Sequence, residues 1–210
     1  WLHQWTEPTQ LRFQVYASLF ENDANLVTDV ELETETIGAQ VGFDSTLSQK
    51  MSVSFLVGWA RLDTEYSRAV GPTPEDDDAN ELLLKGSLDY ESERHKMSLI
   101  VNSEPSGSGN GVIVSAQAVG LEYTYALTER SDFDLELNAG HRSPVDDRIE
   151  NDRDFARVEL GVDYRLSQRW KVAGRYAYSW QAREAVDGTA NSNEVRVSII
   201  YTPEKSIWSR

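Results

Sequence analysis

The chain has 210 residues, no cysteine and a formal net charge of −15. Without cysteine it cannot form disulfides, thiolate nucleophiles or cysteine-based zinc and iron–sulfur sites. The acidic balance, with no Lys/Arg cluster along the sequence, argues against a nucleic-acid partner.

Apolar and polar residues alternate along most of the chain. In the last third, Ala156, Val158 and Leu160 occupy even positions, whereas Arg157 and Glu159 occupy odd ones. A period of two turns one set of side chains to each face of a β-strand. Comparable segments recur and predict about ten antiparallel strands, each with an apolar and a polar face.

The connections between these segments alternate in length. Short ones are expected near residues 45–50, 91–95, 128–132 and 167–170, and long ones near 21–28, 68–79, 103–111, 143–153 and 184–191. Outer-membrane barrels have short periplasmic turns and long extracellular loops. With an even number of strands, both termini are then periplasmic.

A soluble barrel or sandwich would also alternate, with its apolar face inside. We favour a membrane barrel because several segments exceed ordinary strand length and because aromatic residues collect at segment ends, as interfacial rings do. No apolar run is long enough for a membrane helix. The expected aromatic girdle consists of Phe43, Trp59, Tyr90, Tyr125, Phe133, Tyr164, Trp180 and Tyr201.

The predicted fold class is therefore all-β: a closed antiparallel transmembrane up-and-down β-barrel of about ten strands in a bacterial outer membrane. Residues 1–9 are expected to form a periplasmic N-terminal segment, 10–203 the barrel and 204–210 a C-terminal tail. A barrel needs a leader, and none is visible at the N-terminus. Outer-membrane lipid and lipopolysaccharide are the expected partners, together with proteins of an outer-membrane assembly.

Residues 163–170, followed by Gly174-Arg175-Tyr176 and Ser192-Asn193-Glu194-Val195, resemble the β-barrel porin family of proteobacterial outer membranes. The resemblance covers mainly residues 155–203. It implies an outer-membrane location and no catalytic residues, and some members of the family accompany exopolysaccharide secretion. No cofactor is expected. Such barrels usually end on an aromatic residue, whereas here residues 203–210 follow Tyr201, so that either Trp208 extends the last strand or a tail follows it.

The polar face carries the main candidate site, a network of charges inside the barrel. Its members are Arg12, Lys85, Asp89, Glu122, Glu136, Arg157, Glu159, Asp163, Lys171, Arg175, Glu194 and Arg196. They would form either the selectivity lining of a narrow pore or a salt-bridged plug, which the small size of the barrel favours. The expected role is structural, pore-like or associated with export. The alternatives are a lipid- or protein-modifying barrel enzyme at the outer surface and a binding subunit of a larger outer-membrane assembly.

Catalysis is not expected, although His141 and Ser143 could project to one face, as in lipid A deacylases. The acid of such a triad would be Asp147 or Glu150. The alternative is a histidine and a hydroxyl at the lipid headgroup boundary. Carboxylates at residues 74–78, 146–147 and 152–154 could bind Ca²⁺ or Mg²⁺, but no spacing matches a calcium loop, so solvated loops are favoured and no metal site is predicted.

Overall fold

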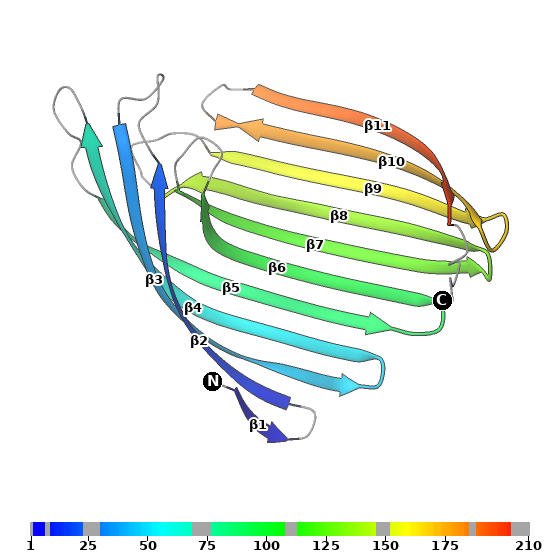
Figure 1. Cartoon of the computed structure of the whole chain (residues 1–210), viewed down its shortest axis with the longest axis horizontal. Helices are drawn as coiled ribbons and strands as arrows, with labels where there is room; N and C mark the ends of the chain where they lie inside the picture. Colours follow the sequence, from blue (N-terminus) through cyan, green and yellow to red (C-terminus); the bar gives the residue numbers. More distant parts are fainter. Residues whose placement is uncertain are drawn as a thin grey trace, which may run out of the picture.

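The computed structural model describes residues 2–6, 9–22, 30–68, 77–107, 113–145, 152–184 and 188–202. They form one antiparallel sheet in which each strand pairs with the next along the chain (Figure 1). The strands are β1 (Leu2–Thr6), β2 (Thr9–Asn22), β3 (Val30–Ser48), β4 (Met51–Arg68), β5 (Asp77–Glu91), β6 (His95–Gly107), β7 (Ile113–Thr128), β8 (Ser131–Pro144), β9 (Arg153–Arg165), β10 (Trp170–Arg183) and β11 (Gly188–Tyr201). Within these ranges, no helix is long and apolar enough to cross a membrane.

The sheet has two faces of opposite character. On β3, Thr34, Thr36 and Gln40 are buried, whereas the intervening Ile37 and Val41 are more than half exposed. We call the face of Thr34 the inner face and that of Val41 the outer face. Among the described strand residues, nearly all exposed large apolar side chains lie on the outer face, with Ile100 and Ile200 on the inner face as exceptions. The alternation therefore assigns the two faces correctly.

The four predicted short connections are confirmed as tight turns between β3 and β4, β5 and β6, β7 and β8, and β9 and β10. The long connections are shorter than expected because the strands continue into them. Residues 103–107, predicted as loop, belong to β6, where their backbone pairs with β7. The remaining loop residues, the acidic 74–76 and 146–147, and the tail from 203 onward lie outside the described residues.

The first nine residues, predicted to lie outside the barrel, contribute β1, which pairs with the start of β2 from Thr6↔Thr9 to Leu2↔Arg12. At the other end of the sheet, β11 pairs with β10 over its whole length. Among the described residues, no strand pairs with the opposite edge of β11. The antiparallel up-and-down architecture is thus confirmed, and the described pairings leave the sheet with two edges.

The sheet splits between β5 and β6. The described pairing of these strands runs from Glu91↔Lys96 to Leu84↔Ser103. Beyond it, β5 stays paired with β4, and β6 stays paired with β7. In Figure 1 the end of β6 turns away from β5 toward the start of β7. We call residues 104–106 of β6 and 113–115 of β7 the tip.

The tip packs over the inner face of β4 and β5. Ile113 contacts the buried cluster of Ala60, Leu62 and Leu83. The Ser115 hydroxyl donates a hydrogen bond of 2.9 Å to Glu81 Oε2. Part of the small-residue surface of β3 and β4 therefore lies beneath the tip, and Thr34 and Ala60 are fully buried.

Candidate functional site: the charged inner face

The strand registers place the predicted charge network on one face. Glu122, Glu136 and Glu159 are successive cross-strand partners on β7, β8 and β9. The other members follow in register on the same side: Arg12, Lys85, Asp89, Arg157, Asp163, Lys171, Arg175, Glu194 and Arg196. Because the period of a strand is two, one correct register fixes the side of every member.

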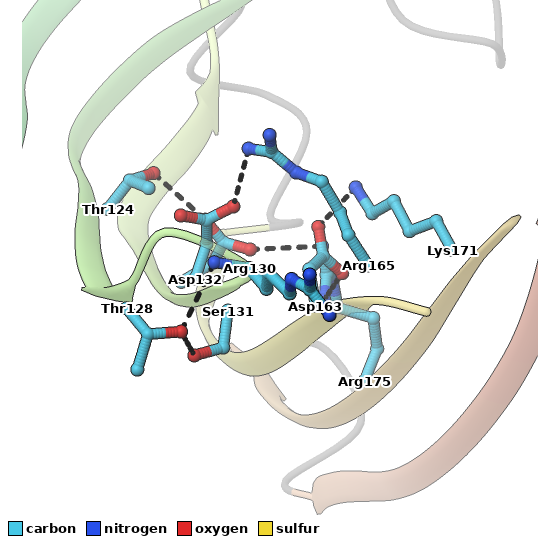
Figure 2. A network of polar contacts seen from close by, with 10 residues as sticks. Thr124, Thr128, Arg130, Ser131, Asp132, Asp163, Arg165, Lys171 and Arg175 are labelled. Atoms are coloured by element: carbon cyan, nitrogen blue, oxygen red, sulfur yellow. Dashed lines mark hydrogen bonds and ion pairs between the residues drawn. The ribbon is translucent and has the colours of Figure 1, made fainter. Parts of the chain in front are cut away.

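Among the described side chains, Asp163 is the most buried charge of this face, with 7% of its surface exposed. Its Oδ1 accepts a hydrogen bond of 2.7 Å from Arg175 Nη1, and Lys171 forms a second ion pair with it. Arg175 Nη2 also donates to Asp134 Oδ2 at 3.0 Å, so one guanidinium joins three strands. Figure 2 shows this network near the turn between β7 and β8.

The cations are needed there because carboxylates face one another. Asp132 lies directly opposite Asp163, and like charges in that position repel. Arg165 Nη2 lies 3.5 Å from Asp132 Oδ2, and Figure 2 shows both residues in this network. The network is thus neutralised locally, and Asp132, Asp134 and Arg165 belong to it although the sequence analysis left them out.

A second group surrounds Arg157. Its Nη2 donates to Glu159 Oε2 at 2.7 Å and its Nη1 donates to Ser179 Oγ at 3.2 Å. Glu136, the cross-strand partner of Glu159, adds a further carboxylate to the same row. Arginine here offsets a row of glutamates that would otherwise repel one another.

The remaining members form smaller pairs. Arg12 pairs with Asp44 at 2.6 Å, Lys85 with Glu104 at 2.5 Å and Arg196 with Glu194 at 2.5 Å. Among the described residues, the two partners of every such ion pair lie on the same strand or on strands at most two positions apart in the sheet. The pairs therefore run along the sheet.

The eight predicted girdle residues lie on the outer face. Phe43 packs against Phe55 with ring centroids 6.3 Å apart, and Tyr125 stacks on His95 at 4.8 Å. Tyr201 meets Trp170 at 4.8 Å. Trp170 was not in the predicted girdle. Its place beside the predicted turn at residues 167–170 is the sequence feature that could have identified it. The other five residues of the predicted set share this face by register: Trp59, Tyr90, Phe133, Tyr164 and Trp180.

His141 lies on the outer face, near the end of β8. Its Nδ1 is 2.7 Å from Asp154 Oδ1, and its Nε2 is 3.9 Å from Asp152 Oδ2. The acid beside the histidine is thus Asp154, its cross-strand partner on β9, whereas Asp147 and Glu150 lie outside the described residues. Within the described ranges, no group of three or more His, Asp or Glu residues could hold a metal ion.

No protein-family model and no curated protein sequence matches the chain. The outer membrane channel DcaP of Acinetobacter baumannii superposes with a TM-score of 0.65 and 15% identity over 96% of this chain and 60% of that one. OmpT, an outer membrane protein of Vibrio cholerae, superposes with a TM-score of 0.47 and 13% identity over 89% of this chain and 63% of that one. A Pseudomonas aeruginosa FadL homologue superposes with a TM-score of 0.41 and 8% identity over 91% of this chain and 73% of that one.

The similarity to DcaP shows the fold. The chain has the antiparallel up-and-down sheet found in this outer-membrane β-barrel protein, which confirms the predicted all-β, up-and-down architecture. It spans about three fifths of the length of DcaP and of OmpT.

Proposed function

We propose that the chain forms the wall of a bacterial outer-membrane β-barrel whose inner face borders a narrow polar passage. The observation that carries the proposal is the contrast between the two faces. Val15, Val41 and Trp59 are more than half exposed on the outer face, where lipid and the acyl chains of lipopolysaccharide would cover them. Most of the described ion pairs lie on the inner face, whereas those of Arg61 with Asp63 and Asp78 lie on the outer face near the end of β4.

The proposal includes a closed barrel, because lipid cannot satisfy the backbone groups of an open sheet edge. The free edge of β11 belongs to a strand whose outer side chains are very exposed, with Val195 at 76% and Val197 at 72%. Such a strand is poorly suited to water. Pairing along this edge and along the opposite edge, formed by β1 and the part of β2 beyond Arg12, would close the wall.

Two observations support a narrow passage. The ion pairs run along the wall, which is the arrangement of a lining, whereas a plug would need pairs across the lumen. The tip would also reduce the open cross-section of the barrel, because Glu104 binds Lys85 and Ile113 packs against the cluster that contains Leu83. A hollow of about 380 Å³ remains between the tip and β2, bordered by Tyr16 and Gln40.

The test is ionic conductance in planar bilayers. We expect protein extracted with mild detergent to migrate faster unheated than boiled, as closed barrels do, and this species to give small conductance steps. Replacing Glu104 and Ile113 together by serine should raise the conductance severalfold, because the ion pair and the apolar contact that hold the tip are lost. Val119→Ser on the outer face is the matched control and should leave it unchanged.

Release of folded protein from membranes by salt alone would overturn the membrane location. Silent bilayers for both the wild type and the tip variant would overturn the passage.

The proposed role is not enzymatic. His141 has carboxylates beside both ring nitrogens, and no hydrogen bond joins it to Ser143 among the described side chains. We expect His141→Ala to leave lipid A acylation unchanged when the protein is expressed in a Gram-negative host, as measured by mass spectrometry. Loss of an acyl chain with the wild type, and its return with His141→Ala, would instead establish a deacylase.

A further inference from the structure

Three arginines stand side by side on the inner face, at the end of the sheet away from the network of Figure 2. Arg142 on β8 is the cross-strand partner of Arg153 on β9, and Arg153 is the partner of Arg183 on β10. Directly opposed like charges repel, so an uncompensated row of three costs stability. In a chain of net charge −15, this concentration of positive charge calls for a partner.

No carboxylate among the described residues pairs with these three arginines. Asp152 and Asp154, the acidic residues on either side of Arg153 in the sequence, instead approach His141 on the opposite face. The Nε atom of Arg153 is buried and has no hydrogen-bond partner. A buried donor without an acceptor is costly, and at a ligand site an acceptor on the ligand supplies what is missing.

The guanidinium groups of Arg142 and Arg153 are held in place and border an open space, and Arg183 adjoins them as the cross-strand partner of Arg153. Arg153 Nη2 donates to Gln181 Oε1 at 2.5 Å, and the Arg142 guanidinium lies 5.3 Å from the centre of the Phe155 ring, in cation–π contact. Arg142, Arg153 and Arg157 line one hollow of about 350 Å³ together with Ser179 and Ser192. Fixed guanidinium forks beside hydroxyl groups suit the oxygen atoms of phosphate and carboxylate groups.

We propose that the row of Arg142, Arg153 and Arg183 is a binding site for the phosphate or carboxylate groups of a water-soluble solute. The site lies on the inner face, which the proposed function assigns to water, whereas a lipid phosphate would be offered from the outer face. The inference rests on that assignment of the faces and does not require that the solute pass through the barrel.

The test is calorimetric titration of the folded protein in neutral detergent with sodium tripolyphosphate. We expect the double variant Arg153→Gln with Arg183→Gln to bind at least tenfold more weakly than the wild type. The matched control is Arg94→Gln with Arg130→Gln, which removes the same charge at the short turns and should bind as the wild type does. Unchanged heat-modifiable migration shows that each variant is folded.

A second titration uses vesicles that contain lipopolysaccharide, and there we expect both double variants to behave alike. Failure of the wild type to bind tripolyphosphate, or an equal loss in the two variants, would overturn the site. If the Arg153→Gln with Arg183→Gln variant lost binding only to the vesicles with lipopolysaccharide, the row would be a lipid site. That result would overturn the proposal of a water-soluble ligand. Because these titrations need no bilayer, their outcome is independent of the conductance measurement.

Discussion

Replacing Gly42 by alanine will prevent most of the protein from folding. A Cβ atom built there would lie 1.8 Å from the carbonyl oxygen of Phe55 and 2.7 Å from the Cα atom of Leu56, both in the backbone of β4. Overpacking usually costs about 1–3 kcal/mol where side chains can shift. Here two paired strands would have to separate, so we expect a loss of the free energy of unfolding of more than about 3 kcal/mol.

The measurement is the urea midpoint of the heat-modifiable species in detergent, with Gly120→Ala as control. Gly120 lies on the same inner face, on β7, where an added Cβ would meet the Leu137 carbonyl oxygen at an ordinary 3.7 Å. We expect a change within about 1 kcal/mol there, since glycine is itself weakly unfavourable in a strand. Equal midpoints for the two variants would contradict the close approach of β3 and β4.

The faces of the sheet were predictable because alternation is a local property of the chain. Once Arg157 and Val158 are assigned to opposite sides, every residue of β9 follows, and the tight turn at residues 166–169 carries the assignment to β10. The pairing of Arg175 with Asp163 could be anticipated in this way. Its second bond, to Asp134, spans two strands and depends on side-chain length and sheet curvature, which the alternation does not encode.

The features beside the long connections could not be predicted. The pairs His141–Asp154 and Arg142–Arg153 depend on the register across residues 145–152, whose length alone does not fix which residues face each other. The split between β5 and β6 was missed for a related reason. Glu104-Pro105-Ser106-Gly107 has the composition of a loop, yet β7 supplies its backbone partners and Lys85 binds its carboxylate.

Replacing Arg175 by methionine will weaken the wall at its most buried ion pair. Methionine keeps much of the side-chain bulk, so the loss reports the charge and the hydrogen bonds. Asp163 would keep Lys171 as its ion-pair partner, while Asp134 would lose the guanidinium 3.0 Å away. Breaking a buried pair on one side typically costs ~3–5 kcal/mol. Because a quarter of the Arg175 side chain is exposed, we expect about 2 kcal/mol in urea unfolding followed by tryptophan fluorescence.

Arg196→Met on β11 provides the control. Among the described residues, Arg196 forms its ion pair along its own strand with Glu194, and both side chains are about half exposed or more. An exposed pair of this kind contributes about 0–1 kcal/mol. Adding Asp163→Asn to Arg175→Met should recover part of the lost stability, since the carboxylate left with an incomplete set of partners is then gone. If Arg175→Met is no less stable than Arg196→Met, the three-strand junction at Asp163 does not hold the wall together.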